Sequence, residues 1–252
     1  MSARIRAGAA RGFTLVELLI AIAIGMALTV VVSQLFYHSR TTYTTTEDVS
    51  RMQENIRFAY QVLTRTVHLA GYKSAPNVAS EVAFPPGAPA ITGVEGAAAG
   101  ASDTLTVSYQ GSGLTFGAAD GTIVDCTGTP VAAGVVAVNT FTVGVGANGA
   151  NALFCNGVET VADVENMQVI YGEDTSGDLV ANNFVNASQV TDMANVRSVR
   201  IALLFSTRSP NSALAIDSTT TYDLHGQVLG PFNDRLIRRP VVLTVSLRNR
   251  TP

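Results

Sequence analysis

A single carboxylate stands near the start of the longest apolar run in this chain. Residues 13–32 carry Glu17 and otherwise only two threonines as polar side chains. An ionised carboxylate in hydrocarbon is costly, so it persists where a cation pairs with it. Cleavage of the peptide bond between Gly12 and Phe13 would create such a cation, because the new amine of Phe13 would lie one helical turn from Glu17. We therefore expect proteolytic processing at this bond and pairing of Glu17 with an amine.

Two cysteines are the next residues with chemistry of their own. Cys126 and Cys155 have no companion His or Cys at metal-ligand spacing, and a cysteine pair fits an oxidising compartment. A disulfide that closes a loop of about 30 residues contributes roughly 3–4 kcal/mol to stability. We expect this disulfide, and two unrelated buried thiols are the alternative.

An acid-rich turn is the weakest of the candidate sites. Residues 173–178 place Glu173, Asp174 and Asp178 around a glycine, and loops of this kind can hold calcium. The full EF-hand pattern fails, because Phe184 and Val185 stand near the position where a closing Glu is needed. A plain turn is favoured over a calcium site at Asp174 and Asp178, and no other metal site is expected.

Nothing else in the sequence forms a catalytic constellation. Residues 144–149 match G-x-G-x-x-G, but a dinucleotide site also needs a helix at the last glycine, and the following residues favour a strand. We interpret this segment as a hairpin loop. The histidines His38, His68 and His225 are scattered along the chain. The expectation is a protein without cofactors that is not an enzyme.

The charge is unevenly distributed along the chain. Three arginines in residues 1–12 precede the apolar run, which predicts a cytoplasmic N-terminus and an exported remainder. Removing them leaves 13 basic residues against 19 acidic ones, so the formal net charge moves from −3 to −6. A protein of this charge has no overall attraction for nucleic acid, so no nucleic-acid partner is expected. A local basic patch is considered around Arg235, Arg238 and Arg239.

The elements that position these residues begin with one long helix. The pattern predicts a helix from Phe13 to Ala70, with Gly71 as its stop. Its first half, residues 13–40, is apolar all round and about 20 residues of it can span a bilayer; an ordinary secretory signal is the alternative. Its second half has one apolar face. A bend or a frayed turn is expected in Thr41–Thr46, since threonine is a mediocre helix former.

The rest of the chain favours β-structure. Residues 76–102 are rich in Pro, Gly and Ala and are interpreted as a surface loop. Beyond them the period changes to two, and one antiparallel sheet is expected to cover the apolar face of the helix. The predicted strands are Leu105–Tyr109, Val135–Val145, Ala152–Cys155, Val164–Tyr171, Val199–Phe205 and Val241–Leu247.

Several segments resemble one family. Gly12-Phe13-Thr14-Leu15-Val16-Glu17 is similar to the cleavage and methylation signal of type IV prepilins. Further segments resemble the PilW group of minor pilins: Glu54–Ala59, Ala70–Tyr72, Val164–Gly172 and Leu247–Arg250.

The resemblance implies an α+β pilin-like fold: leader peptide 1–12, transmembrane and filament-core helix 13–40, and a globular head 41–252. It implies that prepilin peptidase cuts after Gly12 and methylates the amine of Phe13, and that Glu17 sets the axial register in a filament. The implied partners are other minor pilins, the major pilin, a large tip adhesin, prepilin peptidase and the inner-membrane assembly platform. The implied location is the bacterial inner membrane, with the head periplasmic, and then the pilus.

Three alternatives remain open from the sequence. A pseudopilin of a type II secretion system shares the signal, the helix and the sheet. The head could instead be a binding module for a surface, a glycan or DNA, with the pilus as its carrier. A membrane-anchored periplasmic enzyme is the third alternative, and the missing catalytic groups argue against it.

Overall fold

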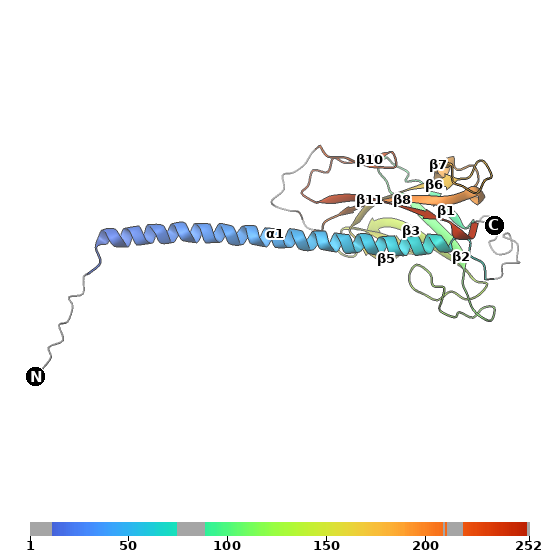
Figure 1. Cartoon of the computed structure of the whole chain (residues 1–252), viewed down its shortest axis with the longest axis horizontal. Coiled ribbons are helices and arrows are strands. Elements are labelled where there is room, and N and C mark those ends of the chain that lie inside the picture. Colours follow the sequence, from blue (N-terminus) through green and yellow to red (C-terminus); the bar gives the residue numbers. More distant parts are fainter. Residues whose placement is uncertain (1–11, 75–88, 209, 211–218, 251–252) are drawn as a thin grey trace, which may run out of the picture. The chain divides into compact units, whose positions relative to one another are not determined.

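The computed structural model describes residues 12–74, 89–208, 210 and 219–250. The chain divides into two compact units, residues 1–46 and 47–252. Its elements are shown in Figure 1, where α1 is a helix from Leu15 to Leu69. Of the predicted leader, only Gly12 lies within the described residues, and residues 76–88 of the predicted loop 76–102 lie outside them.

The threonine-rich segment of α1 is helical throughout, so the fraying expected there is wrong. Each threonine hydroxyl in the segment donates to a carbonyl in the preceding turn. Thr41 bonds Tyr37 O at 3.1 Å, and Thr45 bonds Thr41 O at 2.8 Å. Such bonds satisfy the hydroxyl inside the helix itself, which allows a run of threonines where propensity alone would disfavour it.

The part of α1 in the second unit carries the predicted apolar stripe. Its buried residues recur every three, four or seven positions, which is the spacing of one helix face: Met52, Ala59, Leu63, Thr66 and Val67. The helix ends as expected before Gly71, whose φ of 76° is the left-handed conformation that glycine adopts at no steric cost.

Two antiparallel sheets, rather than the single predicted one, form most of the second unit. The larger sheet has five strands in chain order: β1 Ile91–Val94, β2 Thr104–Gln110, β3 Val136–Val145, β4 Asn151–Cys155 and β5 Val158–Ala162. The other has the order β11 Arg238–Ser246, β8 Val196–Ser206, β6 Val164–Glu173, β7 Asn183–Asn186. A two-stranded ribbon, β9 Tyr222–Leu224 and β10 Gln227–Leu229, and three short 3₁₀ turns, Ala187–Gln189, Met193–Asn195 and Arg248–Arg250, complete the described elements.

Strand β1 corrects the prediction of a loop over residues 76–102. Ile91 pairs with Val107 on β2, and both side chains are fully buried. The composition around it is rich in Pro, Gly and Ala, so the four-residue strand gives little signal in the sequence. Its burial against β2, and not its own propensity, accounts for its formation.

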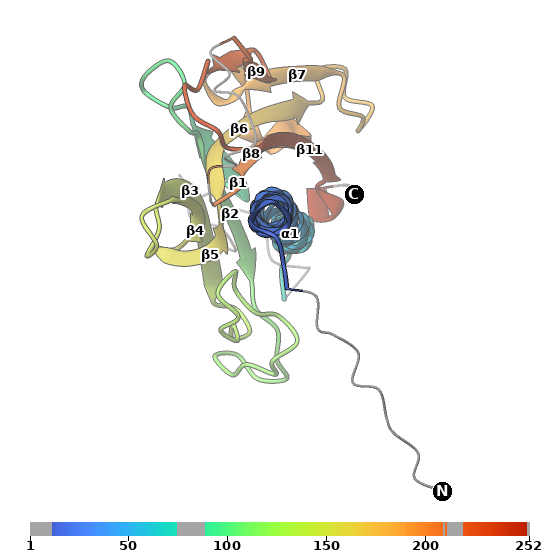
Figure 2. The ribbon, with the colours of Figure 1, turned by 90° about the vertical axis from the view of Figure 1, so that its left-hand side faces the viewer.

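The main core lies between the apolar stripe of α1 and the inner faces of both sheets. One buried cluster joins Leu63 of the helix to Phe141 of the five-stranded sheet and to Ile201 and Leu243 of the four-stranded sheet. Figure 2 shows the strands of the two sheets on different sides of the head portion of α1. The helix stripe is therefore buried by two sheets together.

The four-stranded sheet is covered on its other face as well. Ala202 and Leu204 of β8 pack with Leu224 and Leu229 of the β9–β10 ribbon in a second cluster. Because β8 is buried on both faces, its apolar residues form a nearly continuous run at its C-terminal end.

Arg238 is an internal cation rather than part of a basic surface patch. Its guanidinium donates to both carboxylate oxygens of Glu165, at 2.6 and 2.9 Å, and also to Asp234. It stacks 3.8 Å from the centroid of the Phe232 ring, and its side chain is 5% exposed. Although burial acts against the charge, the two carboxylates raise the pKa of Arg238 overall. The patch considered around Arg235, Arg238 and Arg239 is therefore wrong for Arg238.

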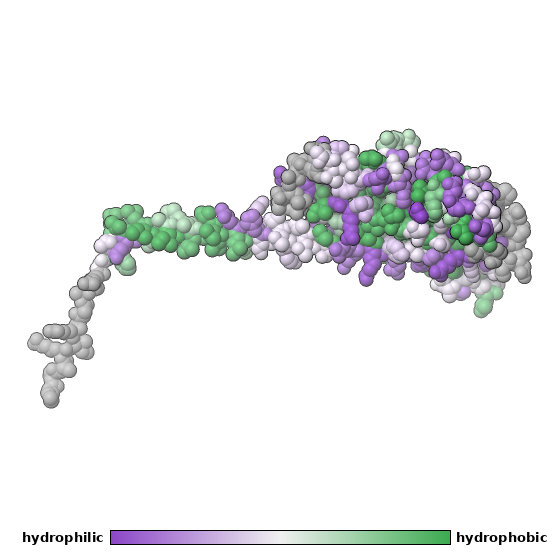
Figure 3. Space-filling model, turned by 45° about the horizontal axis from the view of Figure 1, so that its top comes forward, coloured by the Kyte–Doolittle hydropathy of each residue, from purple (hydrophilic) through white to green (hydrophobic). Residues whose placement is uncertain are grey.

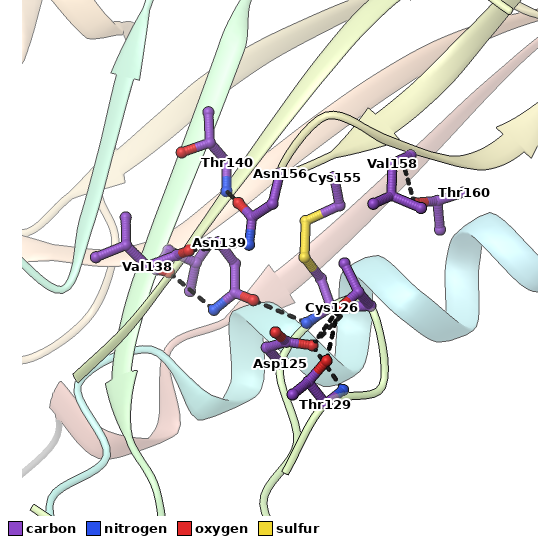
Figure 4. The surroundings of a disulfide bond; sticks show 12 residues. Asp125, Cys126, Thr129, Val138, Asn139, Thr140, Cys155, Asn156, Val158 and Thr160 are labelled. Atoms are coloured by element: carbon purple, nitrogen blue, oxygen red, sulfur yellow. Dashed lines mark hydrogen bonds between the residues drawn. A yellow bond between two sulfur atoms is a disulfide. The ribbon is translucent and has the colours of Figure 1, made fainter. Parts of the chain in front are cut away.

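The predicted disulfide is confirmed. Cys126 and Cys155 are bonded, with their Cα atoms 6.2 Å apart (Figure 4). The bond ties the long β2–β3 connection to the end of β4. Buried Asn139 supports it, because its Oδ1 accepts the Cys126 N–H at 2.8 Å while its amide donates to Val107 O at 3.3 Å.

The same connection is held by α1 and by the five-stranded sheet. The hydroxyl of Tyr109 donates to Val124 O at 2.9 Å, and the Arg65 guanidinium donates to that oxygen at 3.3 Å. Asp125 folds the neighbouring turn by accepting backbone amides from Thr127 and Thr129, each within 2.9 Å. The disulfide thus secures a segment that already makes polar contacts with the core.

Removing the disulfide is expected to cost roughly 3–4 kcal/mol of unfolding free energy. The measurement is urea unfolding of the Cys126→Ser/Cys155→Ser protein, followed by circular dichroism. Reductant should lower the midpoint of the unaltered protein to that of the variant and leave the variant unchanged. A midpoint of the unaltered protein that ignores reductant would contradict the structural role.

Arg238→Ala is expected to destabilise the head by about 3 kcal/mol, because it leaves two acids without their cation in a mostly buried setting. The matched control is Arg239→Ala on the same strand, whose side chain is exposed and whose loss should change stability by less than about 0.5 kcal/mol. Equal losses in the two variants would refute the internal role of Arg238.

Candidate functional site

Glu17 lies in the first turn of α1 and closes a reciprocal cap with Thr14. Its Oε2 accepts the Thr14 backbone N–H and the Thr14 hydroxyl, each at 2.9 Å. In return the Glu17 backbone N–H donates to Thr14 Oγ1 at 3.2 Å. This is a capping box, in which each of two side chains satisfies a backbone amide of the other residue.

This cap was not predicted from the sequence, although its signal is present there. Thr14 and Glu17 are three positions apart at the start of the apolar run, which is the T-x-x-E pattern of a helix start. The carboxylate therefore has a role in its own chain besides any role between chains.

The residues at the expected cleavage bond are accessible. Phe13 is 91% exposed, and a Cβ added at Gly12 would meet no described atom within 4 Å. Packing within the described residues therefore does not require glycine at position 12. The pairing of Glu17 with a Phe13 amine stays a prediction.

The helix that follows Glu17 exposes its apolar side chains. Among its large apolar residues up to Val32, even the least exposed, Ile22, is 44% exposed. The described residues contain one helix long and apolar enough to cross a membrane, with a mean hydropathy of 2.7 over its best window and none of that window buried. Figure 3 shows the hydrophobic character of this part of the helix. Signal sequences have the same length and composition, but a core helix of a folded head would be buried.

Two asparagines in the segments that resemble PilW proteins join α1 to the end of β5 and to the turn after β11. The side-chain amide of Asn55 donates to Ala162 O at 3.2 Å. Asn249 donates to the carbonyls of His68 and Ala70, at 3.0 and 3.4 Å, at the end of the helix. Helix ends leave such carbonyls without intrahelical partners. Asn249 therefore supplies hydrogen bonds at the C-terminal end of α1 that the helix itself does not provide.

The acid-rich loop has the geometry of a hydrogen-bonded turn. The Asp174 carboxylate accepts the amides of Gly177 at 2.7 Å and Leu179 at 2.8 Å, and lies 3.6 Å from Arg197 Nε. These partners outweigh desolvation and lower the pKa of Asp174. Asp178 accepts the Val180 amide at 3.0 Å. Among the described residues, no group of three or more His, Cys, Asp or Glu is arranged to hold a metal ion.

The remaining candidates lie apart from one another. Gly144 and Val145 end β3, and residues 146–149 lie in the predicted hairpin loop before β4, with Gly146 N bonded to Ala150 O at 2.7 Å. His38 stacks edge-on with Tyr37 in α1. His68 Nδ1 lies 3.0 Å from Ser246 O, and His225 occupies the β9–β10 turn with φ 52°.

Comparisons with known proteins can now be set beside this geometry. The family described as Type IV Pilus-assembly protein W matches residues 140–249, and the Prokaryotic N-terminal methylation motif matches residues 8–33. No curated protein matches the chain. Among solved structures, the type IV-like pilin TTHA1219 from Thermus thermophilus aligns with 80% of this chain and 99% of its own, at 17% identity and a TM-score of 0.46. A score at this level does not by itself establish a shared fold.

The methylation match covers the predicted cleavage signal, and the PilW match covers two of the four segments that resemble PilW proteins, Val164–Gly172 and most of Leu247–Arg250. The methylation motif contains Gly12, Phe13 and Glu17, and the other match runs from β3 to the closing Asn249. By these matches residues 140–249 are similar to the PilW family of type IV pilus-assembly proteins, and residues 8–33 carry a prepilin-type methylation motif.

Proposed function

We propose that this chain is a minor pilin that helps to initiate a type IV pilus and lies at or near its tip. The observation that carries the proposal is Glu17, a carboxylate at the start of an exposed apolar helix. The role is structural, and the chain is the substrate of an enzyme rather than an enzyme itself.

The argument from Glu17 concerns what happens when the helix leaves the membrane. In lipid, a carboxylate near the end of a span can reach the headgroups. In a filament core no headgroups are present, so the charge needs a cation on a neighbouring subunit. Cleavage after Gly12 supplies one in the amine of Phe13.

The capping box is compatible with this pairing. In the described part of the chain, the hydrogen bonds of the Glu17 carboxylate end on Oε2. The carboxylate can therefore hold its own helix start through Oε2 and receive an amine on Oε1. A rigid helix start also fixes the direction in which the charge points.

The proposed location and partners follow from the same elements. The basic leader keeps the N-terminus cytoplasmic, the apolar half of α1 spans the inner membrane, and the head is periplasmic until assembly. The proposed partners are the assembly platform, other minor pilins, the major pilin and a large tip adhesin. Glu17 is proposed to pair with the amine of the subunit ahead of it in the filament. The topmost subunit has no such neighbour, so we place this chain below it.

The first test is mass spectrometry of the mature N-terminus. We expect loss of residues 1–12 and one added methyl group on the amine of Phe13. Control cells without prepilin peptidase should yield the uncut chain. An N-terminus at another residue, or an unmethylated Phe13 in cells that hold the peptidase, would reject the proposed maturation.

The second test separates charge pairing from helix capping. Glu17→Gln should reduce the amount of the protein in sheared pili at least tenfold, about 1.4 kcal/mol of lost pairing. Thr14→Ala removes the cap and keeps the charge, at a cost of about 1 kcal/mol in helix stability, and should reduce the amount less. Glu54→Gln, at an exposed position of the same helix, is the matched control.

Two outcomes, one of this second test and one of deleting the gene, would count against the proposal. Glu17→Gln protein that enters pili as well as the unaltered chain would remove its electrostatic basis. Loss of enzyme secretion with normal surface pili, on deletion of the gene, would instead assign the chain to a type II secretion pseudopilus.

A further inference from the structure

The two-stranded ribbon of β9 and β10 covers part of the outer face of the four-stranded sheet. Figures 1 and 2 show it on the opposite side of β8 from α1. Leu224 and Leu229 of the ribbon are buried against Ala202 and Leu204 of β8. A two-stranded hairpin is at best marginally stable by itself, so the ribbon depends on this apolar contact with the sheet.

The ribbon has little polar attachment to the rest of the head. Within the described residues, one hydrogen bond joins it to another element, from the Gly100 N–H to Gln227 Oε1 at 3.5 Å. This distance is long for a hydrogen bond. The turn of the ribbon is held internally, since Asp223 Oδ1 accepts the Gly226 N–H at 2.7 Å. The ribbon can therefore separate from the sheet without breaking a network of hydrogen bonds.

His225 lies in the turn of this ribbon. Its φ of 52° and the φ of 90° at Gly226 are left-handed conformations, as in a tight two-residue hairpin turn. The Nε2 atom of the imidazole is buried and has no hydrogen-bond partner in the described structure. Because burial of an unpaired charge is costly, this position favours the neutral imidazole while the ribbon is closed.

The charged groups that face His225 come from three parts of the head. Arg200 lies on β8, Asp223 on the ribbon itself, and Asp103 in the connection before β2. Burial lowers the pKa of His225, and the positive charge of Arg200 lowers it further, whereas the two carboxylates act in the opposite direction. The pKa of His225 is lowered overall, so the closed ribbon resists protonation of its imidazole.

The nearby carboxylates are engaged with other groups. Asp103 accepts two backbone amides, at 3.0 and 2.8 Å, and Asp223 accepts one. Glu95, whose charge acts on Asp103, accepts the Ser188 hydroxyl at 2.6 Å. None of these three carboxylates forms a hydrogen bond with His225 in the structure. A proton on the imidazole therefore gains no direct ion pair from them in the closed state.

From these features we propose that the β9–β10 ribbon is a pH-sensitive flap, which opens from the sheet when His225 takes up a proton. Opening allows water to reach the imidazolium and exposes Ala202 and Leu204. The inference rests on the head alone and does not depend on the place of the chain in a pilus.

The sign of the pH dependence follows from the lowered pKa of His225. The closed ribbon binds fewer protons than the open one, in which the imidazole has its ordinary pKa of 6.5. The contribution of His225 to closure is therefore fully present above pH 6.5. It is lost as the pH falls from there to the lower pKa of the closed form.

The carboxylates cannot produce the same effect in this pH range. Burial raises the pKa of Asp103, so acid would favour its buried form and oppose opening. The hydrogen bonds from Ser188 lower the pKa of Glu95, so Glu95 titrates in more acidic solution. Opening in mild acid therefore distinguishes His225 from both neighbours.

The test is hydrogen–deuterium exchange of the full-length protein in detergent micelles, followed by mass spectrometry of peptides that contain residues 222–229. Rates are expressed as protection factors, which removes the pH dependence of the exchange chemistry. Protection of the ribbon should fall at least threefold between about pH 7.5 and about pH 5.5, while protection of β6 stays the same. Unchanged protection of the ribbon, or an equal loss in β6, would overturn the inference.

His225→Asn is the variant that assigns the effect, because asparagine suits the left-handed conformation of this turn and does not titrate. Its ribbon should have the same protection at both pH values. His68→Gln is the matched control at the end of α1, and it should lose protection in acid as the unaltered chain does. A loss that persists in His225→Asn, or that disappears in His68→Gln, would assign the titration to another group and refute the flap.

A second pair of variants keeps His225 in place, and it applies even where His225→Asn weakens the ribbon at every pH. Arg200→Gln removes the positive charge that faces the imidazole, so the closed ribbon accepts a proton more readily and loses less protection in acid. Arg239→Gln, at an exposed position of β11, should leave the loss unchanged. Equal losses in the two arginine variants would count against the proposed surroundings of His225.

Discussion

The constraint on which the rest of this molecule depends is one negative charge on an apolar helix. Glu17 cannot be accommodated by the side chains around it, because those that follow in α1 are apolar up to Thr29. The chain itself offers the hydroxyl and amide of Thr14, which stabilise the helix start but supply no positive charge. A neutral cap supplies no positive charge, and under the proposed function that charge is the Phe13 amine of a neighbouring subunit. This is why a helix start that looks complete in isolation still points to assembly.

The two halves of α1 expose different surfaces and therefore suit different surroundings. The apolar half of α1 exposes its side chains all round, so it is suited to lipid or to other helices of the same kind. The second half exposes one face and buries the other between two sheets, so it is suited to water. The second unit gains additional rigidity from the Cys126–Cys155 bond and from the hydrogen bonds of Arg238.

Much of this could be predicted from the sequence, because the strongest signals are local. The apolar run, the stripe that contains Ala59 and Leu63, and the stop at Gly71 all depend on neighbours within a few residues. The disulfide followed from compartment and from the presence of two cysteines. What failed depends on long-range packing. Strand β1 exists because β2 buries it, and the split into two sheets is set by how each one covers the helix. The burial of Arg238 needs Glu165, which is far away in the sequence, so the charge pattern alone indicated a surface patch.

The candidate sites divide in the same way. The T-x-x-E cap was readable from two residues and was overlooked because the carboxylate already had a proposed role. The groove lined by Leu179, Ser198 and Arg248 was not readable, since these residues come from three separate parts of the chain.

The threonines between the two halves of α1 show how a single helix can pass between two solvents. Their hydroxyls are bonded to carbonyls of the same helix, such as Thr42 to His38 and Thr46 to Thr42, at 3.0 and 2.9 Å. A polar group that is satisfied internally does not need water, and an apolar environment does not leave it unpaired. The segment can therefore lie at a membrane surface or among packed helices without a change of structure. A frayed turn at this place would expose backbone amides and carbonyls. These unpaired groups would oppose the movement of the helix from the membrane into a filament, which the proposed pairing of Glu17 favours.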